Sequence, residues 1–298
     1  MKTIFSTLIL CLCTTLVLAQ NEVPLISLEY RTIAQAPIEN AAHKILNDVS
    51  TANSFINLSL NYGHYLKDTT YTIIYSLNYT NVSQSLDISQ VKQKDEFDLL
   101  PKNYYQQPQF SQLSFSTGLS KTFGKGWSLT GLFSVNIVDD FFKSELPTNI
   151  NFGGSTYLER EHNKVAYGAG IIFWQLEERV VVSPVLSFKY QNKKRGIEAL
   201  LPAKIRIWQK INKVSYLAAS ASSNFYSIRY NTDNLVVSTD MFSFTPELTY
   251  NYLWENFIRF TAGIDMPLSD VTISKKNNVF KYKQNSLGFK VGLSLMID

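Results

Sequence analysis

The chain has 298 residues, of which 45% are hydrophobic and 17% are charged, and its formal net charge is +4 at pH 7. This small positive surplus gives no support to nucleic acid as a partner, because phosphate binding needs a concentrated basic surface. Both cysteines, Cys11 and Cys13, lie near the start, so the rest of the chain has no thiol for a disulfide, a metal or a nucleophile.

The first nineteen residues have the pattern of a secretory signal peptide. Lys2 precedes an apolar run from Ile4 to Leu18, and Val17-Leu18-Ala19 places small or short side chains where a signal peptidase cuts. The run is shorter than the roughly 20 residues of a membrane-spanning helix, and no later apolar run reaches that length. We expect cleavage after Ala19, so any membrane crossing in residues 20–298 must use strands.

The remaining sequence alternates apolar and polar residues with a period of two. In the segment 70–82, for example, Tyr71, Ile73, Tyr75, Leu77 and Tyr79 alternate with polar residues, so one strand face is apolar and the other polar. The pattern predicts about twelve strands, at 24–33, 54–64, 70–82, 110–122, 127–137, 164–174, 180–190, 197–208, 215–229, 241–253, 257–267 and 286–297.

Short and long connections take turns between these segments. Short ones are expected near 65–69, 123–126, 176–179, 209–214 and 254–256, and long ones near 34–53, 83–109, 138–163, 230–240 and 268–285; the outward loop from Gln191 to Gly196 is shorter but polar. Tight periplasmic turns and long outward loops are typical of outer-membrane barrels. We therefore predict an all-β fold, an up-and-down antiparallel transmembrane β-barrel over residues 20–298 with both termini in the periplasm.

The four tryptophans all lie within two residues of a predicted short turn. Trp127, Trp174, Trp208 and Trp254 are therefore predicted to lie at the membrane interface, where an indole satisfies both its apolar body and its N–H group. Strict alternation points Trp174 and Trp208 inward, so either a bulge turns them outward or they plug the periplasmic mouth.

The last segment resembles the C-terminal assembly signal of outer-membrane proteins, with Lys290, Gly292, Leu295 and Ile297 at the characteristic spacing. The chain ends in Asp298, whereas many such proteins end in an aromatic residue. Together with the segments 197–203 and 260–263, this signal makes the chain similar to uncharacterised outer-membrane β-barrel families of diderm bacteria. The resemblance implies an architecture and insertion by the barrel assembly machinery, but it carries no catalytic residues.

Catalytic and metal-binding patterns are not found in the sequence. A His-x-Ser pair, as in lipid-cutting barrels, does not occur after His43, His64 or His162. Asp139 and Asp140 are expected near His162 at the outer rim, but the Asp-x-His element of barrel proteases is missing. We predict no enzyme activity, no cofactor and no metal site.

The inward-facing residues differ around the predicted wall. Small side chains come from two segments, as Ser114, Ser116, Gly118 and Ser120 and then Ala166, Gly168 and Gly170. Charged side chains come from others, as Glu198, Lys204, Arg206, Glu247, Arg259, Asp265 and Lys290. These charges are either a salt-bridged filling that closes the barrel or a constriction that sorts small solutes.

The sequence therefore favours an outer-membrane barrel that contacts lipid and forms a narrow passive channel for small solutes. Two alternatives are a barrel hydrolase acting on lipid or peptide and a structural barrel whose loops bind a surface partner.

Overall fold

The computed structural model describes residues 24–37, 50–65, 70–87, 109–139, 149–176, 179–232, 235–275 and 278–296, which form one antiparallel sheet. The predicted signal peptide, His43, Asp140 and Ile297 lie outside these residues. No helix within the described residues is long and apolar enough to cross a membrane. The strands are β1 (Ile26–Pro37), β2 (Ser50–Tyr65), β3 (Tyr71–Asp87), β4 (Gln109–Phe123), β5 (Trp127–Asp139), β6 (Asn149–His162), β7 (Val165–Leu176), β8 (Arg179–Gln191), β9 (Arg195–Leu201), β10 (Lys204–Lys210), β11 (Ser215–Thr232), β12 (Leu235–Trp254), β13 (Ile258–Asp265), β14 (Leu268–Lys275), β15 (Asn278–Asn285) and β16 (Gly288–Leu295).

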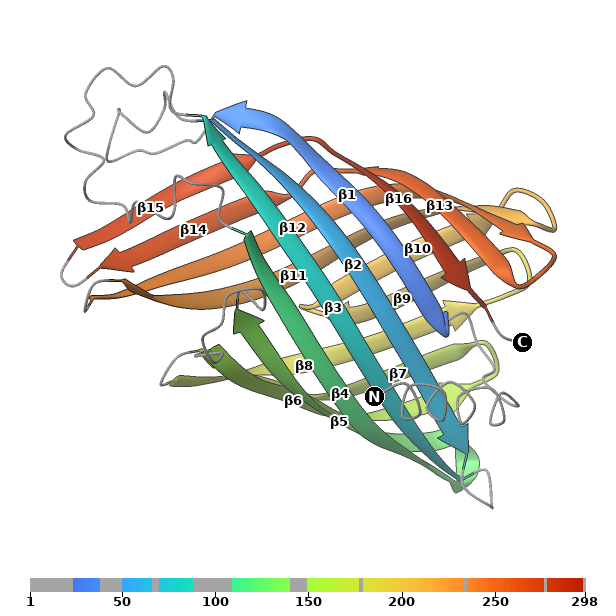
Figure 1. Cartoon of the computed structure of the whole chain (residues 1–298). Helices are drawn as coiled ribbons and strands as arrows, with labels where there is room; N and C mark the ends of the chain where they lie inside the picture. The colour runs from blue at the N-terminus through green and yellow to red at the C-terminus, as the bar shows by residue number, and fades with distance from the viewer. Residues whose placement is uncertain are drawn as a thin grey trace, which may run out of the picture.

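The sheet closes on itself to form a barrel (Figure 1). Strands β1 to β13 pair with their neighbours in chain order, β13 pairs with β16, and β16 pairs with β1. Fourteen strands thus complete the ring. Ile26 and Leu295 are register partners in the closing pair, so the first and last strands meet at one end, which we call the terminal end.

β14 and β15 are not part of this ring. β14 continues the line of β13, and β15 leads into β16. Only Met266 and Pro267 separate β13 from β14, and only Ser286 and Leu287 separate β15 from β16. β12 is long enough to pair with β13 near the terminal end and with β14 beyond it. β15 pairs with β14 and, among the described strands, with no other, so it forms a free edge at the opposite end of the barrel.

β14 and β15 form a hairpin in the segment 268–285, which was expected to be a long loop. The ring itself has two strands more than the predicted twelve, for two reasons. β6 lies in a segment that was expected to be part of a long loop, because Gly153 and Gly154 interrupt its alternation. The segment 197–208 was expected to be one strand, but it is a hairpin of β9 and β10 that turns at Pro202 and Ala203.

Because β6 is one strand more than expected, β7 and β8 run in the direction opposite to the prediction, and the split into β9 and β10 restores the expected direction afterwards. The turn at Asn163 and Lys164 lies at the terminal end, and the connection after Leu176 lies at the opposite end. Residues Gln191 to Gly196 were predicted to form an outward loop, but they turn at the terminal end. The prediction that residues 176–179 form a periplasmic-side turn is therefore also wrong.

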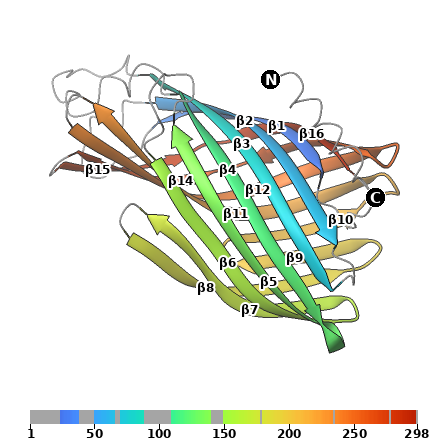
Figure 2. The same ribbon diagram turned by 60° about the horizontal axis from the view of Figure 1, so that its bottom comes forward.

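The hairpin of β9 and β10 is much shorter than the strands beside it (Figure 2). Each of its strands has seven residues, which corresponds to about 23 Å along the strand. β8 continues from Val185 to Arg179 and β11 from Asn224 to Thr232 past the hairpin, and in the described part of the chain these extensions pair on one side only. The wall therefore has a step between β8 and β11.

The outside of the barrel is apolar. Among the residues whose side chains the structure describes, forty-two large hydrophobic side chains are exposed and six hydrophobic residues are buried: Ile33, Val82, Val138, Val185, Trp208 and Ala218. A soluble monomer rarely exposes more than a few hundred Å² of contiguous apolar surface. The alternation of the strands thus turns hydrophobic residues away from the lumen, the reverse of a soluble core.

The tryptophans fall into two groups. Trp254 is 49% exposed on the outside, and Trp127, which lies under the guanidinium of Arg160, also faces outward at the terminal end. Trp208 is buried inside the barrel near the terminal end, and Trp174 faces inward near the opposite end, in register with Gly153. Strict parity therefore holds for Trp174 and Trp208, and neither lies on the outer surface as an interface residue.

The closing pair of strands provides a test of this topology. Ser27 and Ser294 are register partners, and facing residues of antiparallel strands have Cα atoms about 4.5–5.5 Å apart, within reach of a disulfide. We expect the double variant Ser27→Cys and Ser294→Cys to form an intramolecular disulfide, seen as a reducible mobility shift on denaturing gels. The pair Ser27→Cys and Ser286→Cys is the control, since its second position lies about 26 Å farther along the strand. Equal crosslinking of both pairs would contradict this register.

Candidate functional site

One wall of the lumen carries uncharged polar side chains. On β2 and β3 the Ser76 hydroxyl donates to Asn61 Oδ1 at 2.7 Å, Asn78 Nδ2 donates to Ser76 at 3.0 Å, and Thr80 donates to Asn57 Oδ1 at 3.1 Å. On β4 and β5 Ser120 and Thr130 are 2.9 Å apart. These hydroxyls and amides form a neutral, hydrogen-bonded surface.

The small inward residues of β7 allow its neighbours to meet. Gly168 lies between Glu159 of β6 and Ser187 of β8 in the register, and the Ser187 hydroxyl donates a hydrogen bond to the Glu159 carboxylate across it. A Cβ atom at Gly170 would overlap the backbone of Thr156 and Tyr157. Glycine at these positions therefore permits close packing of β6, β7 and β8.

The opposite wall, from β8 through β13 and β16 to β1, carries the charges. Facing residues follow one another across the strands in the series Lys189, Glu198, Arg206, Ser220, Glu247 and Asp265. Glu198 has a cation on each side in this series, whereas Glu247 and Asp265 face each other with like charge and are paired with Lys290 and Arg31 from other strands.

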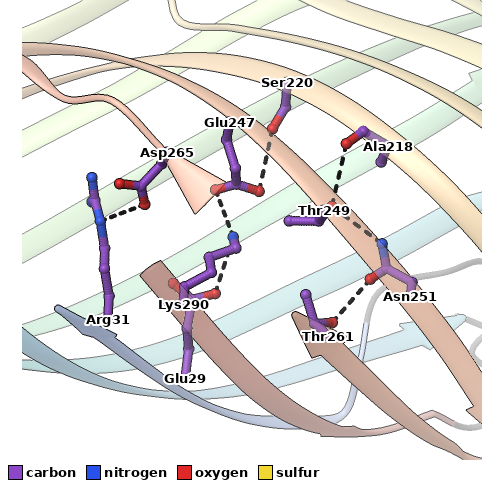
Figure 3. Close-up of polar contacts among 10 residues, drawn as sticks. All are labelled: Glu29, Arg31, Ala218, Ser220, Glu247, Thr249, Asn251, Thr261, Asp265 and Lys290. Carbon is purple, nitrogen blue, oxygen red and sulfur yellow. Dashed lines mark hydrogen bonds and ion pairs between the residues drawn. The ribbon is translucent and has the colours of Figure 1, made fainter. Parts of the chain in front are cut away.

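Lys290 is the centre of one ion cluster on this wall (Figure 3). Its Nζ lies 2.5 Å from a carboxylate oxygen of Glu247 and 3.4 Å from one of Glu29. Glu247 also accepts a 3.5 Å hydrogen bond from Ser220. One ammonium group thus connects β1, β12 and β16.

A second ion pair spans the closing strands. Arg31 Nε on β1 lies 2.6 Å from Asp265 Oδ2 on β13, and the Asp265 side chain is only 1% exposed. Gly288 of β16 is the register partner of Asp265 on one side and of Ile33 on the other, and a Cβ atom there would overlap the Asp265 carboxylate. The absence of a side chain at Gly288 is what admits this buried carboxylate.

Two arginines converge on Tyr216 of β11. Arg206 Nη2 donates to the phenol oxygen at 3.3 Å and Arg259 Nη1 donates at 3.2 Å, and the Arg206 guanidinium also lies over the Tyr216 ring. The Trp208 ring meets Tyr216 edge-on at 6.3 Å. Trp208 itself covers Gly196, where a Cβ atom would come within 2.5 Å of the indole. The aromatic pair therefore holds the phenol that both guanidinium groups contact.

These side chains surround a cavity of about 430 Å³ inside the barrel. Its lining includes five basic and three acidic residues, namely Lys189, Lys204, Arg206, Arg259, Lys290, Glu29, Glu198 and Glu247. The remaining polar lining comes mostly from hydroxyl and amide side chains, including Thr249, Asn251 and Thr261, which form a hydrogen-bonded chain.

Six of the seven charged residues singled out from the sequence line this cavity: Glu198, Lys204, Arg206, Glu247, Arg259 and Lys290. The seventh, Asp265, is buried against Arg31 instead. Sequence reasoning missed Glu29, Arg31, Lys189 and Tyr216. The parity of their strands would have placed the first three inward, since each alternates with outward-facing apolar residues.

The histidines offer no catalytic arrangement among the described residues. His64 is exposed and stacks on Tyr62, and His162 is exposed at the terminal end. Asp139 ends β5 at the other end of the barrel, so the expected rim cluster of Asp139 with His162 is wrong. The described residues also contain no group of three potential metal ligands.

No protein-family model and no curated protein matches the chain. Among solved structures, it is similar to an outer membrane channel from Pseudomonas putida F1, with 11% identity, a TM-score of 0.45 and coverage of 93% of this chain and 97% of that one. It is also similar to outer membrane phospholipase A from Escherichia coli, with 12% identity, a TM-score of 0.38 and coverage of 92% and 97%. The translocator domain of the autotransporter NalP from Neisseria meningitidis has 10% identity, a TM-score of 0.37 and coverage of 99% and 95%. Likeness at this level assigns no activity.

Gly288 provides a test of the seam. Gly288→Ala is expected to displace the Asp265 carboxylate from Arg31 and to lower the free energy of unfolding by about 1–3 kcal/mol, because a well-packed site must shift. Gly292→Ala is the matched control, since its nearest neighbour is Leu28 O at an ordinary 3.4 Å. Urea unfolding in detergent micelles measures both, and equal stability of the two variants would contradict the packing described.

Proposed function

We propose that the protein spans the outer membrane of a diderm bacterium and is a narrow passive channel for small solutes. The apolar exterior supports the membrane location. On β12 the outward residues from Phe242 to Tyr252 are all apolar, and eleven residues tilted by about 40° cover roughly 25 Å, the height of the apolar band of outer-membrane barrels.

Aromatic and basic side chains gather outside at the terminal end. Trp254 packs beside Phe257, Arg160 covers Trp127, and Lys121 lies about 5 Å above the rings of both Tyr71 and Phe123. Rings that are apolar in body and paired with cations suit the headgroup boundary of a bilayer. This girdle supports placing the terminal end at a membrane surface, which we propose is the periplasmic one.

The channel proposal depends on how the lumen charges pair. Lys290 with Glu247 and Glu29, and Arg31 with Asp265, connect strands on the same side of the barrel and do not bridge to the neutral wall of β2 to β5. Fourteen strands about 4.8 Å apart with a tilt of about 40° give a backbone diameter of roughly 28 Å, wider than side chains from one wall can fill. This arrangement supports an open lumen over a salt-bridged plug.

The membrane location predicts a cost for charge on the outer face. Leu248→Arg, at an exposed position in the middle of the apolar band, is expected to lower the stability of the barrel in lipid bilayers by about 2–4 kcal/mol. Gln209→Arg, at an exposed position near the terminal end, should change it by about 0–1 kcal/mol. Reversible unfolding in lipid vesicles measures both values. Equal tolerance of the two arginines would contradict the proposed location.

The channel predicts that a bulky reagent inside the lumen reduces current. Ser220 lines the cavity, so in a background with Cys11 and Cys13 replaced by serine, Ser220→Cys should react with a positively charged methanethiosulfonate and lose part of its single-channel conductance. Ala219→Cys is the matched control, because the adjacent residue faces outward and should leave the current unchanged after reaction.

Heat-dependent gel mobility verifies that each variant is folded. A folded barrel with no resolvable current in planar bilayers would remove the channel proposal and favour a structural barrel that binds a surface partner.

A further inference from the structure

Four neighbouring turns at the terminal end carry a concentration of basic side chains. They connect β4 to β5, β6 to β7, β8 to β9 and β10 to β11, so they follow one another along one end of the barrel (Figure 2). Residues 121–127, 160–165, 191–196 and 209–215 contain one acidic residue, Glu161, and nine basic residues, which we call the basic rim: Lys121, Lys125, Arg160, Lys164, Lys193, Lys194, Arg195, Lys210 and Lys213. All of them except Lys121 are exposed.

Backbone contacts join the four turns into one surface. The Gln191 N–H donates to the Lys164 carbonyl at 3.1 Å. The Lys210 N–H donates to the Lys194 carbonyl at 2.7 Å. The turn before β5 contacts the end of β6, because a Cβ atom at Gly126 would overlap a backbone carbonyl there. Each turn therefore touches the next, and the nine cations belong to a continuous patch.

The positive charge of this patch is not neutralised by carboxylates. The ion pairs of the described residues include no member of the basic rim. Asparagine side chains also fix two of the turns. Asn192 Oδ1 accepts hydrogen bonds from the N–H groups of Lys194 at 2.8 Å and Arg195 at 2.9 Å. Asn212 Oδ1 accepts one from Val214 at 2.9 Å. The rim thus presents its charge from turns with a fixed backbone.

The same turns expose apolar side chains beside the cations. Ile211 is 57% exposed and Val214 is 37% exposed in the turn between β10 and β11. Phe123 is exposed at the end of β4, with the Lys121 ammonium 5.2 Å from its ring. A turn surrounded by water gains nothing from exposing such groups, whereas at a bilayer surface they enter the acyl region while the cations reach the phosphates.

We infer that the basic rim binds the headgroups of anionic phospholipids in the membrane leaflet at the terminal end, an inference that rests on the proposed membrane location. Lys and Arg near an anionic membrane surface each add to the attraction, and the exposed apolar residues contact the acyl chains of the same lipids. The turn between β12 and β13 differs, because it carries Glu255 and no basic residue. Anionic lipid therefore collects along β4 to β11 and not beside this turn.

The first experiment measures lipid preference with the purified full-length barrel in phosphatidylcholine vesicles. Trace spin-labelled phosphatidylglycerol should associate with the barrel at least about threefold more strongly than spin-labelled phosphatidylcholine. In about 1 M salt, where the Debye length is about 3 Å, most of this preference should disappear. Millimolar glycerol phosphate, which has the charge of the headgroup but no acyl chains, should leave the preference in place.

Tryptophan fluorescence locates the bound lipid. Trp127 lies under Arg160 of the basic rim, and Trp254 lies outside the rim beside Glu255. In variants that keep one of these two tryptophans and have phenylalanine in place of the other three, brominated phosphatidylglycerol should quench Trp127 more than brominated phosphatidylcholine does. Trp254 is the matched control, and the two brominated lipids should quench it equally.

Charge variants test the rim itself. The double variant Lys125→Gln and Lys164→Gln removes two cations from the turns next to Trp127, so the excess quenching by phosphatidylglycerol should fall at least about twofold. Lys283→Gln is the matched control, because this exposed lysine lies on β15 at the opposite end and should leave quenching unchanged. Heat-dependent gel mobility verifies that each variant is folded.

The possible results distinguish this inference from the membrane location. Equal association of the two spin-labelled lipids, equal quenching of Trp127 by both brominated lipids, or a preference that glycerol phosphate abolishes overturns the inference and leaves the location standing. A Trp127 that neither lipid quenches removes the terminal end from the bilayer, and the inference fails with the location. If a single-tryptophan variant does not fold, the spin-label measurement on the double glutamine variant decides: a weaker preference supports the rim, and an unchanged one overturns it.

Discussion

The closure of the ring governs this molecule, because a closed ring leaves no exposed row of backbone donors and acceptors where its strands pair on both sides. Closure depends on β1 meeting β16 in register from Ile26 to Ile33, with the chain's first and last strands far apart in sequence. Arg31 and Asp265 reach across β16 at that place, and Lys290 connects β16 to β1 and β12. Ion pairs of the lumen thus connect the strands that close the ring, β1, β12, β13 and β16.

The charged residues give the lumen its chemical character. Carboxylates near the seam are engaged by Lys290 and Arg31, whereas on β8, β9 and β10 the basic residues Lys189, Lys204 and Arg206 surround Glu198. Trp208 packs on Gly196 and on Tyr216, the residue that Arg206 and Arg259 both contact.

Period-two alternation was enough to predict a barrel, most of its strands and the inward charges, because the side of the wall on which a residue lies depends only on parity. Alternation was not enough to predict β6, because Gly153 and Gly154 interrupt its series of apolar residues. In the structure the Phe173 ring of β7 lies over Gly154 and supplies the apolar surface that this glycine lacks. The convergence of Arg206 and Arg259 on Tyr216 could not be predicted from parity either. It requires the register of four strands, and register depends on turn geometry that a single sequence does not specify.

The hairpin of β9 and β10 shows why a turn can be missed when strands are predicted from alternation. Leu200 and Lys204 are register partners, so the residues across the turn are four apart and both face inward. An even separation leaves parity unbroken, and Ile197 to Trp208 then has the same pattern as one continuous strand. Pro202 is the local sign against that interpretation, because proline interrupts a ladder. The turn also brings Glu198, Lys204 and Arg206 together on two short neighbouring strands, so the wall is lowest beside these residues.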